Sequence, residues 1–424
     1  MTSRRIFLAS AGAAALSGRL SAQTTPSNRL RVAVMGLGRG LAHINAWLQV
    51  PDVEITGLCE VDSRRMAEGL RAVEKAGQKA RPDTETDIRK LLTGGKLDVL
   101  SIAAPNFWHT PATNWALGVG CHVYVEKPGS HTAAECMKML QAEEQYELRV
   151  QQGTQRRSLP AMREAIQRLK EGVIGKVTIA RCWYDADRKS IGRGKVTPPP
   201  DWLSWDLWQG PLMETPYRDN LVHYNWHWLW HYGGGELANN GVHGLDLAVW
   251  GLSEAHGRRL YPKQVTCMGG RYHFDDDQET PDTVSLAADL GPCMVTWEGS
   301  SCHKRNAGES HPFVTFYGTE GSLALTSNGY TLYDAEGKET GRNAPPFSDV
   351  PHFQNLADAI RDGKRLHCPA RDGQVAAIIC HLGNIAYRSG GAVSFNPELG
   401  GSLVNPTQAA SALWTKEYRK GWRM

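Results

Sequence analysis

Two segments of the chain combine side chains that can move protons with a local pattern that would bury them. In the first, Lys127 follows the apolar run His122–Val125 and stands between Glu126 and Pro128. A lysine at the end of a buried strand is partly desolvated, which makes its neutral form more accessible and suits it to orient or polarise a hydroxyl group. The alternatives are a lysine that binds phosphate and a solvated charge at a strand end.

The second segment contains His243 between Asn239 and Asp246. The spacing of these three residues places them on one face of a helix. Histidine is the side chain most often used as a general acid or base, so His243 is the candidate for proton transfer. Asp246 would orient the imidazole or cap a backbone group; the alternative for His243 is a satisfied histidine in the core.

Glycines follow the first strand-like run, Leu30–Met35, at positions 36, 38 and 40, and residues 41–50 have helical periodicity. This order predicts a strand, a tight turn and a helix, which together bind a pyrophosphate. Gly36 permits the turn, and Gly38 lets backbone N–H groups approach the phosphates. The third position of the fingerprint is Leu41, and Gly40 is expected to take part of its role.

The run Val53–Cys59 predicts a second strand that ends at Glu60, where an acidic residue would bind the ribose hydroxyls. Glu60 favours NAD, whereas Arg64 and Arg65 could neutralise the 2′-phosphate of NADP and keep that cofactor possible. Strands that alternate with helical stretches predict a parallel sheet whose carboxyl ends hold the ligand. Two more strands are expected in this part of the chain, at 97–103 and 122–125.

The pattern changes near residue 151 to short strands and a few helices. Strands are predicted at 177–183, 265–272, 283–290, 294–299, 313–317 and 322–326, and helices at 161–171, 352–360 and 375–387. We therefore expect an α/β protein with a Rossmann domain over 28–150. An α+β domain for substrate binding and oligomerisation follows over 151–424, built on a large, open, mostly antiparallel sheet.

Many of the 14 tryptophans fall between residues 202 and 230, together with Tyr217. In one interpretation their faces stack on pyranose rings while Arg156, Asn225 and His227 bond the sugar hydroxyls. In the other, the aromatic side chains form the core of an irregular insertion. We expect a mixture, in which most are structural and one or two face the substrate.

His223, His227 and His231 would form one ligand stripe for zinc on a continuous helix. Aromatic residues at nearly every intervening position, and the glycines that follow at 233–235, predict extended or irregular backbone instead. No metal is therefore expected.

The composition limits the possible partners. The 424 residues carry a formal net charge of only +3, and no basic run interleaves with aromatic residues, which argues against nucleic acid. No segment is long and apolar enough to span a membrane. Nine cysteines occur without a C-x-x-C pair, so no disulfide framework is predicted.

The first residues have the pattern of an export signal. Ser3–Leu8 contains a twin-arginine motif, an apolar run follows from Ala9 to Leu16, and cleavage is predicted after Ala22. These features predict a signal peptide over 1–22, the twin-arginine export machinery as a partner and a periplasmic location.

Four landmarks make the chain resemble the Gfo/Idh/MocA family, which includes glucose-fructose oxidoreductase and inositol dehydrogenase. They are Gly36-Leu37-Gly38, Pro105-Asn106 with His109, Glu126-Lys127-Pro128, and Asn239 to Asp246. The resemblance places Lys127 beside the nicotinamide and the reacting hydroxyl, with a proline that is often cis after it. In inositol dehydrogenase-like members an aspartate precedes the catalytic histidine by four residues, a position that Asn239 occupies here.

The resemblance and the residues together give a set of expected sites. Lys127 and His243 are the expected catalytic residues. Cofactor contacts are expected from Gly36, Gly38, Arg39, Gly40, Glu60, Pro105, Asn106, His109, Glu126 and Gln155. Substrate contacts are expected from Arg156, Tyr217, Asn225, His227, Asn239 and Asp246.

The expected activity is NAD(P)-dependent oxidation or reduction of a sugar. Twin-arginine export carries folded proteins, so the cofactor would be loaded first and stay bound, and the reaction would run as a redox-neutral cycle. One alternative is a glycosidase that works by transient oxidation and elimination, although exported relatives of that kind have an altered Glu-Lys-Pro motif. A sugar-binding protein without activity is the other. A homodimer or homotetramer is expected because the open sheet leaves a face for a second subunit.

Overall fold

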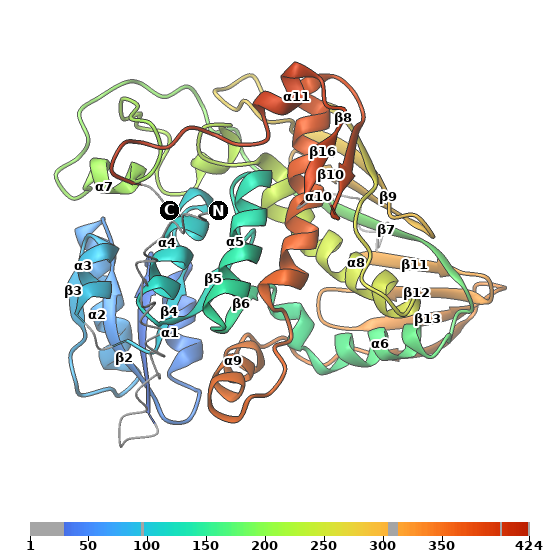
Figure 1. The fold of residues 1–424 in the computed structure, drawn as a ribbon, viewed down its shortest axis with the longest axis horizontal. Coiled ribbons are helices and arrows are strands. Elements are labelled where there is room, and N and C mark those ends of the chain that lie inside the picture. Colours follow the sequence, from blue (N-terminus) through green and yellow to red (C-terminus); the bar gives the residue numbers. More distant parts are fainter. Residues whose placement is uncertain (1–28, 95–96, 304–312, 399–400, 423–424) are drawn as a thin grey trace, which may run out of the picture.

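A computed structural model describes residues 29–94, 97–303, 313–398 and 401–422. These residues form two β-sheets with helices packed around them (Figure 1). The expected signal peptide and its cleavage site lie outside the described residues.

The first sheet has six parallel strands in the order β3-β2-β1-β4-β5-β6. Successive strands are added on one side of β1 up to β3 and on its other side from β4 onward, so the switch point lies between β1 and β4. Its strands are β1 (Leu30–Met35), β2 (Val53–Cys59), β3 (Asp83–Glu85), β4 (Val99–Ile102), β5 (His122–Glu126) and β6 (Val150–Gly153). The helices are α1 (Gly40–Trp47), α2 (Ser63–Lys75), α3 (Ile88–Thr93), α4 (Asn106–Gly118) and α5 (Ala133–Tyr146). The expected Rossmann topology is confirmed, and its carboxyl edge is where a ligand binds.

The second sheet has ten strands in the order β14-β13-β12-β11-β7-β10-β9-β8-β15-β16, and only the β7–β10 pair is parallel. Strands near the expected positions are β7 (Val177–Asp185), β8 (Gln264–Gly270), β9 (Thr283–Asp289), β10 (Met294–Ser300), β11 (Val314–Gly318) and β12 (Gly321–Leu325). Two strands at each end of the sheet were not expected: β13 (Tyr330–Asp334), β14 (Glu339–Asn343), β15 (Val393–Asn396) and β16 (Ser402–Val404). β15 and β16 have only four and three residues, which makes their periodicity hard to read.

Helices cover one face of the ten-stranded sheet (Figure 1). They are α6 (Pro160–Lys170), α8 (Val242–Ala255) and α10 (Ala370–Ser389), while α9 (Val350–Asp362) packs on the first domain and α11 (Gln408–Ala412) lies beside α10. Side chains on this face of the sheet, such as Val295 and Trp297, are buried. On the other face Met268 is 78% exposed and Met294 is 37% exposed, so part of that face is open.

An aromatic segment covers the carboxyl edge of the first sheet. Residues 201–232, which we call the aromatic cap, contain the short helix α7 (Trp205–Gln209) and share one apolar cluster with Phe107 and Trp108 of α4. Figure 1 shows these loops above α3 and α4. Five aromatic side chains of the cap are buried: Trp208, Tyr217, Trp226, Trp228 and Tyr232.

No helix within the described ranges is long and apolar enough to cross a membrane. All nine cysteines are free thiols, and every one except Cys267 is buried.

Candidate functional site

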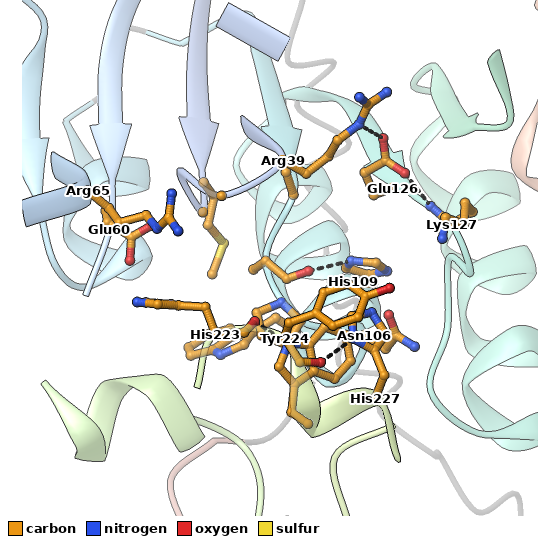
Figure 2. A pocket seen from close by; sticks show the side chains of 18 of the residues that line it. Arg39, Glu60, Arg65, Asn106, His109, Glu126, Lys127, His223, Tyr224 and His227 are labelled. Carbon is orange, nitrogen blue, oxygen red and sulfur yellow. Dashed lines mark hydrogen bonds and ion pairs between the residues drawn. The ribbon is translucent and has the colours of Figure 1, made fainter. Parts of the chain in front are cut away.

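A cavity of about 710 Å³ opens between the two domains at the carboxyl edge of the first sheet (Figure 2). Fourteen of the expected site residues line it: Gly36, Gly38, Arg39, Glu60, Pro105, Asn106, His109, Glu126, Lys127, Gln155, Arg156, His227, Asn239 and His243. The topology brings together residues that are more than 200 positions apart in the chain.

The glycine turn has the geometry that a dinucleotide requires. Gly36 has φ +81, and a Cβ there would lie 2.7 Å from the backbone nitrogen of Ala104. A Cβ on Gly38 would meet nothing within 4 Å, so the backbone at this position faces open space in the cavity. The N-terminus of α1 follows immediately, and its N–H groups add partial positive charge for a pyrophosphate. The cradle therefore fits the expected cofactor.

Gly40 does not line the cavity. A Cβ at this position would lie 3.0 Å from Cγ1 of Val34, so its glycine allows α1 to pack closely on β1. This is the packing role of the third glycine in the fingerprint, part of which Gly40 was expected to take. The cofactor contact also expected from Gly40 does not fit its place outside the cavity.

Glu60 directly follows β2 and is almost fully buried. Its carboxylate accepts hydrogen bonds from the backbone N–H groups of Leu37, Val61 and Asp62 at 2.6, 2.7 and 2.9 Å. It therefore ties the glycine turn to the end of β2, and Glu60 is also one of the residues that line the cavity.

The two arginines after Glu60 differ in their contacts. Arg64 forms an ion pair with Asp62 and lies over the ring of Trp202, 3.4 Å from its centroid. Arg65 lines the cavity and has one ion pair, at 3.4 Å, with Glu68. Only Arg65 is thus placed to meet a phosphate on the ribose.

Glu126 is a buried carboxylate with three side-chain partners. It accepts hydrogen bonds from His43 at 3.0 Å, Gln155 at 2.9 Å and Arg39 at 3.4 Å. Burial opposes its ionisation, but the hydrogen bond and charge of His43 and the charges of Arg39 and Lys127 outweigh it and lower the pKa of Glu126. Glu126 therefore stays ionised and holds Arg39 and Gln155, which both line the cavity. Figure 2 shows the pair of Glu126 and Arg39.

Lys127 projects from the end of β5, and the peptide bond to Pro128 is cis. Its Nζ donates to the backbone oxygen of Asn239 at 2.8 Å and to the side-chain oxygen at 3.2 Å. Burial lowers the pKa of Lys127, against the attraction of Glu126. Its neutral form is accordingly easier to reach than that of an exposed lysine.

His243 stands one residue into α8, directly after a π-helical turn, Leu237–Gly241. Its ring has no hydrogen-bond partner among the residues that the structure describes, which leaves both nitrogens available to a ligand in the cavity. Burial, followed by the charges of Lys127 and Arg156, lowers the pKa of His243. The imidazole is therefore neutral near pH 7 and can accept a proton.

His109 joins two parts of the site. Its ring nitrogens lie 2.5 Å from the carbonyl oxygen of Pro128 and 2.8 Å from that of Ala104. Because burial lowers the pKa of His109, the ring is neutral and donates one hydrogen bond at a time. This residue fixes the segment after β4 against the one that carries Lys127.

The aromatic cap supplies the wall opposite the glycine turn (Figure 2). His227 hydrogen-bonds through Nδ1 to the carbonyl oxygen of Tyr224 and stacks on Trp226, and burial lowers its pKa to about 3. Tyr224, 54% exposed, accepts a hydrogen bond from the amide of Asn239. Asn239 therefore links Lys127 to Tyr224 of the aromatic cap by hydrogen bonds.

Three expected substrate residues lie away from the cavity. Tyr217 is buried against Trp205, and Asn225 donates to the carbonyl oxygen of Asn220. Asp246 pairs with Arg157 at 2.8 and 2.9 Å, and both are at most 4% exposed. A buried arginine is costly without a carboxylate partner. Asp246 therefore serves Arg157 and not His243, as its two hydrogen bonds show.

Several lining residues were not expected: Met35, Cys59, Val61, Thr86, Ile88, Ala103, Ala104, Trp108, Leu207, Trp208, His223, Tyr224, Trp226 and Phe347. Arg65, considered above for the 2′-phosphate of NADP, lines the cavity as well. Phe347 lies in a loop before α9 and carries no pattern that could have identified it.

The three histidines of the stripe do not bring their ligand atoms together in the part of the chain that the structure describes. His223 bonds Asp62 at 2.8 Å, His227 bonds Tyr224, and His231 bonds the carbonyl oxygen of Met213 at 3.0 Å. Elsewhere in the described ranges, His273, Cys302 and His303 have ligand atoms within 4.8 Å of one another, outside this cavity.

A parallel sheet with a glycine cradle, joined to a second domain that completes the cavity, defines the class of two-domain oxidoreductases built on an NAD-binding Rossmann fold. The chain belongs to the Gfo/Idh/MocA oxidoreductase family. Residues 30–154 match the family's "NAD-binding Rossmann fold" and residues 169–424 its "C-terminal alpha/beta domain".

Individual relatives carry several names. The chain is 23% identical over 450 residues to a "Glycosyl hydrolase family 109 protein" of Parabacteroides distasonis, covering 93% of this chain and 95% of the relative. It is 24% identical over 250 residues to the "D-glucoside 3-dehydrogenase" of Escherichia coli, covering 57% and 61%. The match to the "Alpha-N-acetylgalactosaminidase" of Bacteroides fragilis, 26% identical over 170 residues, spans 39% of this chain and only 40% of that relative.

A solved structure has the same fold. The aldose-aldose oxidoreductase from Caulobacter crescentus, complexed with glycerol, has a TM-score of 0.65 at 16% identity, covering 86% of this chain and 99% of that one.

Proposed function

We propose that this protein is an NAD(P)-dependent oxidoreductase that acts on a hydroxyl-bearing carbon of a sugar. The observation that carries the proposal is the convergence of Lys127, Asn239 and His243 in the cavity that also contains the glycine turn. When bound, the cofactor would supply hydride acceptance and return.

The side chains of the site divide the remaining work. His243, neutral and without a protein partner among the described residues, takes the proton of the substrate hydroxyl. Lys127 donates a hydrogen bond to the same oxygen and stabilises negative charge that develops on it. Asn239 holds the lysine in place through two oxygens. The reverse reaction returns the proton from His243.

The sugar class rests on the cavity wall and on the names of relatives. Tyr224 and His227 offer neutral polar groups to hydroxyls, and Trp226 and Trp208 offer apolar ring surface. Two similar proteins, the D-glucoside 3-dehydrogenase and the aldose-aldose oxidoreductase, have names that describe oxidoreductases of sugars or glycosides.

We propose NAD as the cofactor, because the Glu60 carboxylate would repel the 2′-phosphate of NADP. Arg64 is committed to Asp62, so only Arg65 is left to offset that repulsion. Tight binding is supported by the contacts of the aromatic cap with the first domain. The backbone N–H of Ser63 donates to Trp202, that of Ser204 donates to Val61, and the indole of Trp108 donates to Trp208. These bonds close the cap over the cleft.

Export with bound cofactor completes the proposal. Arg4 and Arg5 would direct the folded protein to the twin-arginine machinery and the periplasm. A bound cofactor without an external pool must be regenerated in place, so the reaction would be redox-neutral. Replacing both arginines with lysine should keep the protein in the cytoplasm; unchanged periplasmic yield contradicts this part.

A glycosidase is the second candidate, supported by the name of the Parabacteroides relative. Oxidation of a ring carbon acidifies the neighbouring C–H, elimination then breaks the glycosidic bond, water adds to the double bond, and the hydride returns to the ring. The same Lys127 and His243 would serve both reactions.

One experiment separates these functions. The cofactor is released from gently purified protein and identified, and the holoprotein is then incubated with free sugars and glycosides without added NAD. Turnover beyond one equivalent supports the redox-neutral cycle, and released aglycone assigns the glycosidase. Strict dependence on added NAD(P) contradicts a closed cycle, and absence of bound or bindable cofactor would leave only a sugar-binding protein.

The exposed face of the ten-stranded sheet is the proposed subunit interface. Light scattering of the purified protein should give the mass of a dimer or tetramer. If it does, Met268→Asp should shift that mass towards the monomer.

A further inference from the structure

Arg156 is a cation in the substrate side of the cavity that lacks a carboxylate partner. It follows β6 and lies close enough to Lys127 and His243 for its charge to act on both. Burial lowers the pKa of Arg156, and Asp349 is the charged residue that counteracts this effect.

The guanidinium is held by contacts that leave its outer edge unused. Nε donates to the carbonyl oxygen of Ser327 at 3.2 Å, and Cζ lies 4.8 Å from the centroid of the Phe313 ring. The N–H groups on its two terminal nitrogens have no hydrogen-bond partner in the part of the chain that the structure describes. A planar fork fixed in this way is prepared for two parallel hydrogen bonds to one acceptor group.

The nearby carboxylates form no ion pair with Arg156. Glu126 is engaged by His43, Gln155 and Arg39. Asp349 accepts from Arg39 at 2.7 Å and forms no ion pair with Arg156. A half-buried charge with no protein partner is costly, and a ligand carboxylate would offset that cost.

We propose that Arg156 binds a carboxylate on the substrate, so that the preferred substrate class is an acidic sugar, a uronic acid or a uronide. One fixed fork matches one planar carboxylate. Three other polar residues that line the cavity, His227, Tyr224 and Asn239, are neutral and match hydroxyls. This inference rests on the proposed function, because it specifies the substrate of the same site.

The test measures binding separately from turnover. D-glucuronate and D-glucose, and likewise D-galacturonate and D-galactose, are titrated into the holoprotein by calorimetry. In at least one pair the acid should bind about tenfold more tightly or better, as expected for hydrogen bonds between charged groups. Arg156→Gln should abolish this preference, Arg156→Lys should keep part of it, and Arg163→Gln, an exposed arginine on α6, should keep all of it.

Equal affinity within both pairs, or a preference that survives in a folded Arg156→Gln protein, would overturn the inference. Thermal unfolding of each variant establishes that it is folded. Reduction of the bound cofactor by each sugar is recorded in parallel. Preferential binding without any reduction would support the role of Arg156 and contradict the proposed oxidoreductase, whereas reduction by neutral sugars without preference would do the opposite.

Discussion

The ammonium group of Lys127 donates hydrogen bonds to two oxygens of Asn239, the backbone carbonyl at 2.8 Å and the side-chain amide at 3.2 Å. Neither oxygen carries a formal charge. Asn239, a residue of the second domain, thus orients the lysine without adding a negative charge that would stabilise the ammonium form. This arrangement preserves the lowered pKa that burial produces.

Asn239→Asp should raise the pKa of Lys127 by about 1 to 3 units, because a carboxylate would then lie within hydrogen-bond distance of the ammonium. If the neutral lysine takes part in the reaction, the alkaline range of activity shifts upward by the same amount. The pH dependence of cofactor reduction measures the shift. Asn239→Ser, which adds no charge, is the control, and an unchanged profile in Asn239→Asp would contradict the proposed coupling.

Lys127→Met should lower the rate of hydride transfer by a factor of about 10² to 10⁴, the usual contribution of a positioned acid or base. Bound cofactor should remain, since the glycine turn and Glu60 are untouched. The measurements are cofactor content after purification and single-turnover reduction. Lys170→Met, on the exposed side of α6, serves as the control; full turnover in Lys127→Met would remove the lysine from the chemistry.

The order of strands and glycines was sufficient to predict the first domain, because each part of that signal is local. Gly36 must have positive φ, and the strand that ends at Glu60 follows within one βαβ unit. Lys127 was also predictable, since the carboxyl end of a buried parallel strand can be located from its apolar run.

Contacts between distant segments were not predictable. His43, on the buried face of α1, bonds Glu126, yet nothing in its own helix distinguishes it from a packing residue. Asp246 was expected to orient His243 because helical spacing puts the two residues on one face. The spacing gives no information on residues from other elements, and Arg157, from a separate helical turn, pairs with Asp246 instead. The π-helical turn before α8 further changes the angular relation that α-helical spacing assumes.

Asp246→Ala should destabilise the protein by about 3 to 5 kcal/mol, because Arg157 would remain buried without its main partner. Asp372, 3.9 Å from the same guanidinium, is too distant to replace both hydrogen bonds. Urea unfolding measures the loss. The double variant Arg157→Met, Asp246→Leu should lose much less; an equal loss would assign the effect to packing rather than to the unpaired charge.

Asp62 should make the attachment of the aromatic cap sensitive to acid. Its carboxylate accepts hydrogen bonds from the backbone and guanidinium of Arg64 and from His223 of the cap. Burial opposes its charge, but these bonds outweigh that effect and lower the pKa of Asp62 from 3.8 to about 2. Because the folded pKa lies below the unfolded value, the stabilisation is complete above that unfolded value and is lost as pH falls towards 2.

Asp62→Asn should therefore lower the free energy of unfolding by about 1 to 2 kcal/mol near neutral pH. Solvent weakens the Asp62–Arg64 ion pair, because the Arg64 side chain is more than half exposed, and this limits the loss. The difference from the unchanged protein should shrink as pH falls below about 4. Unfolding by urea at several pH values measures it, and Asp83→Asn, an exposed residue of β3, is the control. A difference that stays constant over this pH range would show that the charge of Asp62 does not secure the cap.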